Sequence, residues 1–101
     1  MFAMQETVYK RIMMYTFIDG ETVWKIHATH GFPLELSIPE LAERGFMVTW
    51  LELLIAAQKD GANLETLIAR LEAIACDSYP KHISGPILER FAAISSWFPK
   101  L

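Results

Sequence analysis

Two histidines and one cysteine are the residues of this chain whose types and spacing could support chemistry. His27 and His30 are three positions apart, so a helix would place both on one face. Two imidazoles can begin a zinc site, but zinc in proteins usually takes three or four protein ligands. Cys76 and His82 could join them only from distant parts of the chain, and no spacing requires it. We therefore predict no metal site, with His27 and His30 as the weak candidates.

A catalytic role for Cys76 has little support in the sequence. A nucleophile needs a neighbouring base and a third group that orients the base. Cys76 falls in an apolar helical pattern, which predicts a buried, reduced thiol instead. The five glycines are isolated from one another, so the sequence has no phosphate-binding or dinucleotide-binding loop. We predict no enzymatic activity, no catalytic residue and no cofactor.

Length, charge and composition exclude further classes of function. The 101 residues suit one small helical domain over residues 1–101. Nine Lys and Arg against twelve Asp and Glu give a net charge of −3, and the basic residues are scattered, which argues against a nucleic-acid partner. No apolar run approaches the roughly 20 residues of a membrane-spanning helix, and no signal peptide is visible. We expect a cytoplasmic protein without membrane association.

Gly and Pro divide the chain into segments with helical patterns. We predict helices over about residues 4–17, 21–29, 37–45, 49–60, 63–78 and 84–96. A competing interpretation makes Asp19-Gly20 the turn of a β-hairpin. We favour helices because polar and apolar residues do not alternate cleanly on either side of that dipeptide. The predicted fold class is all-α, a compact orthogonal bundle of five to six short helices.

Polar residues ahead of apolar runs predict where these helices begin. Ser37 with Glu40, and Thr49 with Glu52, have the spacing of capping boxes, while Asn63 and Ser84 are the predicted caps of the last two helices. Residues 63–78 carry the cleanest apolar stripe, which should face a core. Its members are Leu64, Leu67, Ile68, Leu71, Ile74 and Ala75.

The two neighbouring segments 37–45 and 49–60 raise the possibility of a DNA-binding helix-turn-helix. A recognition helix must present polar or basic side chains to the edges of bases. The second segment begins with Trp50-Leu51-Glu52 and is apolar and acidic instead. A helix-turn-helix regulator is therefore only our second alternative, and a joint between two packed helices is the preferred interpretation.

Residues 20–37 read GETVWKIHATHGFPLELS. This stretch resembles a segment of alanyl-tRNA synthetases that reads approximately GEVAFKLYDTYGFPLDLT, and the similarity continues loosely to Gly45. The matching residues are Gly20, Glu21, Lys25, Thr29, Gly31, Phe32, Pro33, Leu34 and Leu36. The resemblance implies a helix, a Gly-Phe-Pro turn and a second helix, at the start of the family's helical tRNA-recognition region. It assigns no catalytic or tRNA-contacting residue to this chain.

The apolar content of 52% is high for so small a globule, and it predicts a contact surface. We predict a small non-catalytic helical protein that acts through a protein partner or as a homo-oligomer. The alternative, implied by the resemblance, is a tRNA-associated or translation-associated accessory protein. Aromatic and Met residues are favoured at interfaces, so both ends of the chain supply the candidates. These are Trp97, Phe98, Leu101, Phe2 and Met4.

Overall fold

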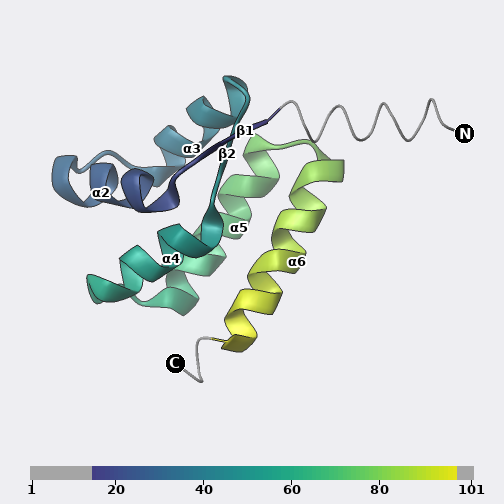
Figure 1. The fold of residues 1–101 in the computed structure, drawn as a ribbon. Coiled ribbons are helices and arrows are strands. Elements are labelled where there is room, and N and C mark those ends of the chain that lie inside the picture. The colour runs from purple at the N-terminus through teal and green to yellow at the C-terminus, as the bar shows by residue number, and fades with distance from the viewer. Residues whose placement is uncertain (1–14, 98–101) are drawn as a thin grey trace, which may run out of the picture.

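The computed structural model describes residues 15–97 of the chain. Two short strands and five helices follow one another there (Figure 1). Their order is β1 (Thr16–Ile18), α2 (Gly20–His30), α3 (Leu34–Glu43), β2 (Phe46–Val48), α4 (Trp50–Lys59), α5 (Leu64–Ser78) and α6 (Lys81–Trp97). The predicted all-α class with five to six helices is confirmed, and the two-stranded sheet is an addition to it.

The two strands pair in parallel, with Ile18 opposite Val48. The backbone N–H of Thr16 donates to the carbonyl of Gly45 at 2.8 Å, and that of Thr49 donates to the carbonyl of Ile18 at 3.0 Å. Parallel strands cannot be joined by a tight turn and need a long crossover. Helices α2 and α3 form that crossover, so the small sheet fixes where this helix pair starts and ends.

Strand β1 corrects two predictions about the beginning of the chain. The predicted helix over residues 4–17 is wrong at residues 16 and 17, which belong to β1, and residues 4–14 lie outside the described part. The competing interpretation, a hairpin at Asp19-Gly20, is also wrong, because Asp19 is the N-cap of α2. Its carboxylate accepts a hydrogen bond from the backbone N–H of Glu21 at 3.1 Å. A capping Asp of this kind satisfies a first-turn N–H that has no partner within the helix.

Glycine ends α2 where the sequence predicts it. Gly31 has a φ of 67°, and its N–H donates to the carbonyl of His27 at 2.9 Å. This left-handed conformation favours glycine, because any side chain there would be strained. Gly45, with a φ of 85°, plays the same part after α3.

Helices α3 and α6 begin earlier than the predicted caps at Ser37 and Ser84. In α3 the hydroxyl of Ser37 donates backwards to the carbonyl of Pro33 at 3.0 Å, so it does not cap the helix. In α6 the backbone N–H of Ser84 donates to the carbonyl of Pro80 at 2.8 Å, and Ser84 is buried. Both serines therefore lie inside helices that start just after a proline.

Helix α4 starts where predicted, but its capping box does not form. The hydroxyl of Thr49 accepts a hydrogen bond from the N–H of Gly20 at 2.8 Å and donates to the carboxylate of Glu52 at 3.0 Å. Because strand β2 and not a turn connects α3 to α4, the two helices do not form a helix-turn-helix. The predicted cap of α5 is confirmed, since the side chain of Asn63 accepts from the N–H of Thr66 at 3.1 Å.

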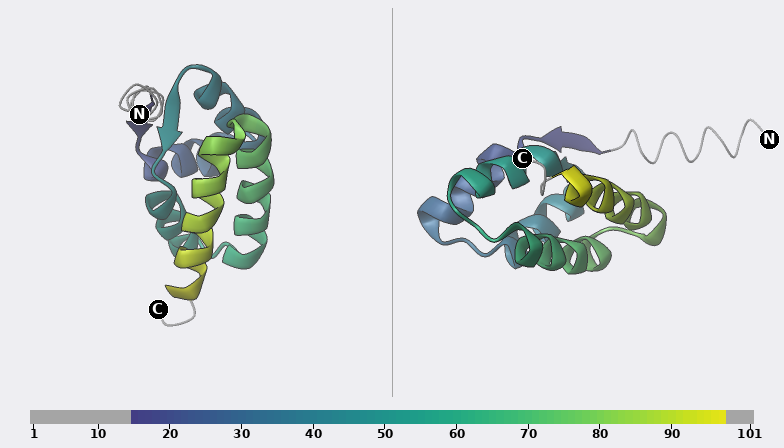
Figure 2. Two further views of the ribbon diagram at one scale, coloured as in Figure 1. Left: turned by 90° about the vertical axis from the view of Figure 1, so that its right-hand side faces the viewer. Right: turned by 90° about the horizontal axis from the view of Figure 1, so that it is seen from below.

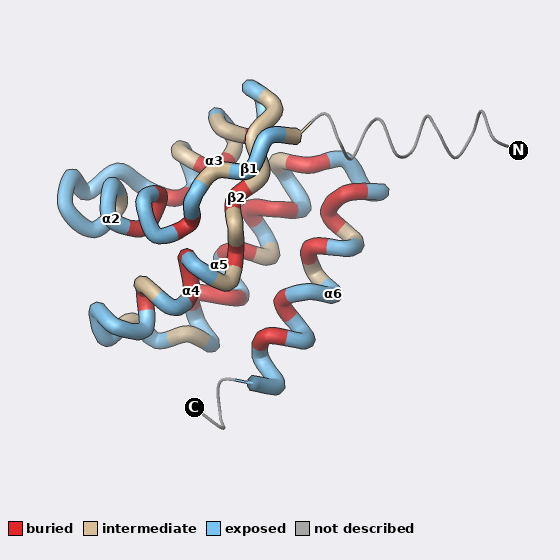
Figure 3. The backbone as a smooth tube through the Cα atoms, viewed as in Figure 1, coloured by how far each residue is buried: buried red, intermediate tan, exposed pale blue. Residues whose placement is uncertain are grey.

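The helices pack in pairs, α2 on α4, α3 on α5 and α5 on α6. Helices α5 and α6 lie side by side, and α2 lies on the opposite side of the strands from α6 (Figures 1 and 2). Figure 3 shows a buried stripe along each helix, and these stripes meet in one core. The fully buried large side chains are Phe91, Leu34, Ile38, Leu53, Leu54, Leu71 and Val48.

The predicted stripe of α5 is confirmed, with Leu64 half-buried and its other members buried. Cys76 corrects a prediction, because its side chain is exposed. One residue after buried Ala75, a helix has turned by about 100°, which is enough to carry Cys76 onto the solvent face. Within residues 15–97, no helix combines the length and the apolar run needed to cross a membrane.

Candidate functional site

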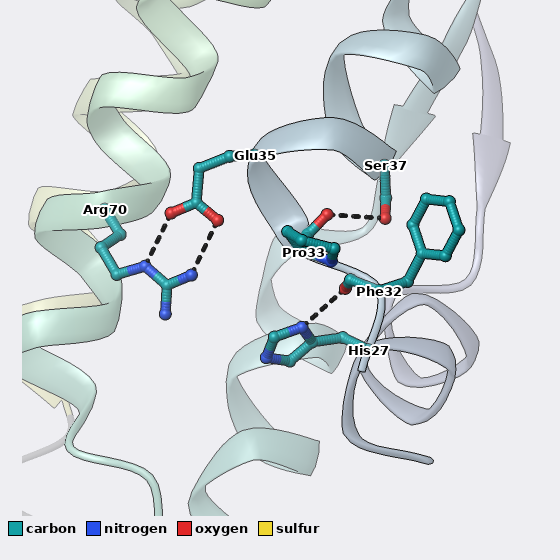
Figure 4. A network of polar contacts seen from close by, with 6 residues as sticks. All are labelled: His27, Phe32, Pro33, Glu35, Ser37 and Arg70. Carbon is teal, nitrogen blue, oxygen red and sulfur yellow. Dashed lines mark hydrogen bonds and ion pairs between the residues drawn. The ribbon is translucent and has the colours of Figure 1, made fainter. Parts of the chain in front are cut away.

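His27 and His30 belong to the joint between α2 and α3. The Nδ1–H of His27 donates to the backbone carbonyl of Phe32, with 2.8 Å between the atoms (Figure 4). The imidazole also packs on the indole of Trp24, at 5.1 Å between ring centroids. His30 is the exposed last residue of α2. Within the described part of the chain, no three His, Cys, Asp or Glu side chains come together as a metal site would require.

An ion pair fastens this joint to α5. Two nitrogens of the Arg70 guanidinium donate to the two carboxylate oxygens of Glu35, at 2.8 and 3.0 Å (Figure 4). These hydrogen bonds lower the pKa of Glu35 below its usual value. The joint therefore has a structural role, which is to hold α3 against α5.

Replacing Glu35 by glutamine should make the free energy of unfolding depend less steeply on pH in the acidic range. The folded-state pKa of Glu35 is lowered, so its contribution is present above the unfolded pKa and disappears as the pH falls through the folded pKa. About half of each side chain stays in water, so the loss near neutral pH should be only about 0.5 kcal/mol. Urea denaturation of both proteins at several pH values measures this. Glu43→Gln, at an exposed position of α3 outside the ion pairs of the described residues, is the control; an equal loss there would contradict the assignment.

A second polar cluster joins the first turns of α2 and α4. The carboxyls of Asp19 and Glu52 lie close together, and their interaction lowers the pKa of Asp19 and raises the pKa of Glu52. Asp19 also accepts from the N–H of Glu21 and the hydroxyl of Thr22, which lowers its pKa further. Both carboxyls are exposed. Asp19 is itself the N-cap of α2, and Glu52 accepts from the hydroxyl of Thr49, the N-cap residue of α4. We therefore assign this cluster to the packing of α2 against α4.

An apolar groove of about 570 Å³ lies between the strands, the start of α4 and the first half of α6. Side chains alternate between the two faces of a strand. Phe17 of β1 and Met47 of β2 are opposite each other, and both line the groove. Ile18 and Val48 are on the other face, where Val48 is buried in the core and Ile18 packs against it. Val48 also lines the groove, and Met47 also packs against the core, so the sheet borders both.

Trp50 lines the groove and carries a buried hydrogen-bond donor that is unpaired within residues 15–97. Its side chain is only 4% exposed, yet its indole N–H has no hydrogen-bond acceptor among the described residues. By contrast, the indole of Trp24 donates to Asp60 at 2.6 Å, and the hydroxyl of Tyr79 donates to the carbonyl of Phe46 at 2.7 Å. A buried donor without an acceptor costs about 1–3 kcal/mol. An acceptor supplied from outside the described residues would recover that energy.

Polar and charged side chains lie on the rim of the groove, on both sides. His82 and Arg90 extend from α6, and Glu52 extends from α4. Arg90 takes part in none of the ion pairs found within residues 15–97. The rim can therefore orient an apolar ligand that carries an acidic group at one end.

Of the predicted interface residues, only Trp97 lies in the described part. It is the last residue of α6, it is 61% exposed, and it does not line the groove. Phe2, Met4, Phe98 and Leu101 lie outside the described residues. Sequence reasoning missed the groove, because its walls come from segments far apart in the chain. The most exposed large apolar side chain of the described part is in that groove, Phe17 at 70%.

Comparison with known proteins finds one similar segment. The alanine–tRNA ligase of Bifidobacterium longum (strain NCC 2705) is 34% identical to this chain over 74 residues. The match covers 69% of this chain and 8% of the ligase, so the chain spans about 8% of that relative's length. No protein-family model and no solved structure matches the chain. The resemblance inferred from residues 20–37 is confirmed as a partial one.

Proposed function

We propose that this chain is a small, non-catalytic helical module that binds an apolar peptide segment of a protein partner in the groove. The buried indole N–H of Trp50 is the observation that carries the proposal. Apolar walls contribute affinity but do not orient a ligand. A buried donor that needs an acceptor fixes where one oxygen of the ligand must lie. The groove volume of about 570 Å³ is in the range of ligand sites.

The walls define the chemistry of the peptide that would fit. Phe17 and Met47 offer apolar surface, and covering an exposed Phe side chain contributes about 1.5–3 kcal/mol. The N–H of Trp50 calls for an oxygen acceptor. Arg90 and His82 favour an acidic side chain at one end of the peptide. The expected ligand is thus an apolar peptide with one carboxylate and one well-placed oxygen.

The absence of catalysis is part of the proposal and has its own support. The hydroxyl of Thr49 in the groove wall is already engaged by Gly20 and Glu52. The other polar groups named, Glu52, His82 and Arg90, lie on the exposed rim, where no base is poised on a nucleophile. These features favour binding over reaction.

Peptides selected from a random 12-residue phage library against the full chain should bind through the groove. We expect Phe17→Ser to lower the affinity for the selected peptides by about tenfold, because it removes apolar contact area from the groove wall. Leu36→Ser is the matched control, since Leu36 is 60% exposed and lies outside the groove. Calorimetry with synthetic peptides measures both affinities.

The same titrations decide between contact surfaces. Peptides that bind wild type and Phe17→Ser equally well would remove the groove from the proposal. Peptides weakened only by Trp97→Ser would move the contact to the predicted tail surface at the end of α6. Failure to select any peptide would contradict the binding function itself.

The similarity to an alanine–tRNA ligase favours a second candidate function, a translation-associated accessory protein that contacts tRNA. Such contact would be electrostatic and should weaken steeply with salt. The net charge of −3 disfavours it. Native-gel shifts of unfractionated tRNA at low and high salt test the candidate. No shift at low salt would remove it.

A further inference from the structure

We propose that the groove is occupied by residues 1–14 of its own chain, and that a partner peptide must displace them. This inference rests on the proposed function, because it names what regulates the same groove. It starts from the position of Tyr15, the first described residue. Tyr15 lines the groove, and its ring packs edge-on against Tyr79 at 5.4 Å between centroids.

The covalent link gives residues 1–14 an advantage over any free peptide. Residue 14 is bonded to Tyr15, so the segment starts at the groove wall itself. A segment tethered so closely reaches an effective concentration in the millimolar range. Even weak apolar contacts would then keep the groove occupied.

The composition of the segment suits the groove. Its residues read MFAMQETVYKRIMM, of which nine of fourteen are apolar. Met4, Val8 and Ile12 recur every four residues and would share one face of a helix. Eight residues of helix span about 12 Å, and the groove wall of α6 extends over the same interval, from His82 to Arg90. The apolar face and the wall therefore have matching lengths.

The position of Tyr15 fixes the direction of the segment. Tyr79 immediately precedes Pro80 and the start of α6, so Tyr15 enters the groove at the His82 end. A segment that runs along α6 from there places Ile12 near His82 and Met4 near Arg90. Gln5 would offer an amide oxygen to the N–H of Trp50.

Acidic substitutions in the full chain test the inference. Val8→Asp places a charge on the apolar face, and Met13→Asp places the same charge on the opposite face. In wild type and Met13→Asp, the Trp50 indole N–H signal, assigned with Trp50→Phe, should be protected from solvent exchange. In Val8→Asp it should shift and exchange at least tenfold faster. Identical spectra for the two variants would overturn the inference. Circular dichroism checks that each variant keeps its helical content.

Binding of the selected 12-residue peptides separates this inference from the proposed function. We expect those peptides to bind Val8→Asp about tenfold more tightly than Met13→Asp, because their competitor is gone. Equal affinities would overturn the inference and leave the proposed function standing. A Trp50 signal that responds to Val8→Asp while no peptide binds any variant would overturn the proposed function alone. If light scattering showed a dimer that Val8→Asp dissociates, residues 1–14 of one copy would occupy the groove of the other copy. That result would overturn occupation within one chain.

Discussion

Replacing Gly20 by alanine is expected to lower the free energy of unfolding by about 3 kcal/mol, at the upper end of overpacking effects. Gly20 opens α2 directly against the first turn of α4. A Cβ atom there would collide with the carbonyl oxygen of Thr49 and come within 2.6 Å of the backbone nitrogen of Leu53. Backbone atoms cannot rotate aside as side chains can. The collision would force α2 away from α4 and break the hydrogen bond from Gly20 to Thr49.

Gly85→Ala is the matched control for this substitution. Gly85 lies inside α6, and an added Cβ there would have nothing within 4 Å. Alanine is favoured over glycine in a helix by about 0.5–1 kcal/mol, but the ring of Pro86 crowds a Cβ on the residue before it, so this variant should change stability by less than about 1 kcal/mol. Urea denaturation followed by circular dichroism measures all three proteins. Equal midpoints for Gly20→Ala and wild type would show that α2 and α4 can separate without cost.

Truncation of Phe91 should have the largest effect on stability, a loss of about 3–5 kcal/mol. Its side chain is fully buried in α6 and packs edge-on against Trp50, at 5.2 Å between centroids. Phe91→Ala removes this packing and leaves a cavity between α6 and α4. A domain of this size has a total stability of only about 5–15 kcal/mol, so the variant should be partly unfolded at about 37 °C.

Phe32→Ala is the control for the same loss of a phenyl ring. Phe32 is 53% exposed and lies outside the groove, and truncation at exposed positions usually changes stability by less than about 0.5 kcal/mol. Thermal denaturation distinguishes the two variants. Equal losses of stability in both would show that burial of the ring does not set its contribution.

Helix ends could be predicted wherever a backbone requirement restricts the residue type. Gly31 and Gly45 adopt left-handed conformations, which few other residues tolerate. Asn63 caps α5 with its side chain as its position before an apolar stripe predicts. These signals are local, because the residue and the group it satisfies are at most a few positions apart.

The starts of α3 and α6 could not be predicted in this way, and for one shared reason. Residues 33–39 and 80–86 both follow the pattern Pro-x-x-x-Ser-x-Pro. A Ser followed by Pro is typical of a cap and first turn. A Ser inside a helix can instead bond back to a carbonyl, as Ser37 does to Pro33. Each helix then tolerates an inner proline, Pro39 or Pro86, at the loss of one backbone hydrogen bond.

The strands and the groove depend on contacts that no local pattern records. Strands β1 and β2 have three residues each, too few for alternation to be recognised. Their pairing joins Thr16 to Phe46 across two helices. The groove then needs β1, β2, α4 and α6 together. This assembly buries the indole N–H of Trp50 where the described residues offer it no acceptor. Sequence reasoning could place Trp50 on a helix but could not find this unpaired donor.

The shortness of β1 also bears on aggregation. The backbone groups of Thr16 and Ile18 form hydrogen bonds with β2 and the residues that flank it. The N–H and C=O of Phe17 therefore point away from β2, outward from the edge of the sheet. Long, flat strand edges act as templates on which further chains can pair. In the described part of β1, one residue offers two backbone groups, too few to fix the register of an incoming strand. Within residues 15–97, the sheet thus fixes the crossover while the outer edge of β1 offers little on which a further strand could pair.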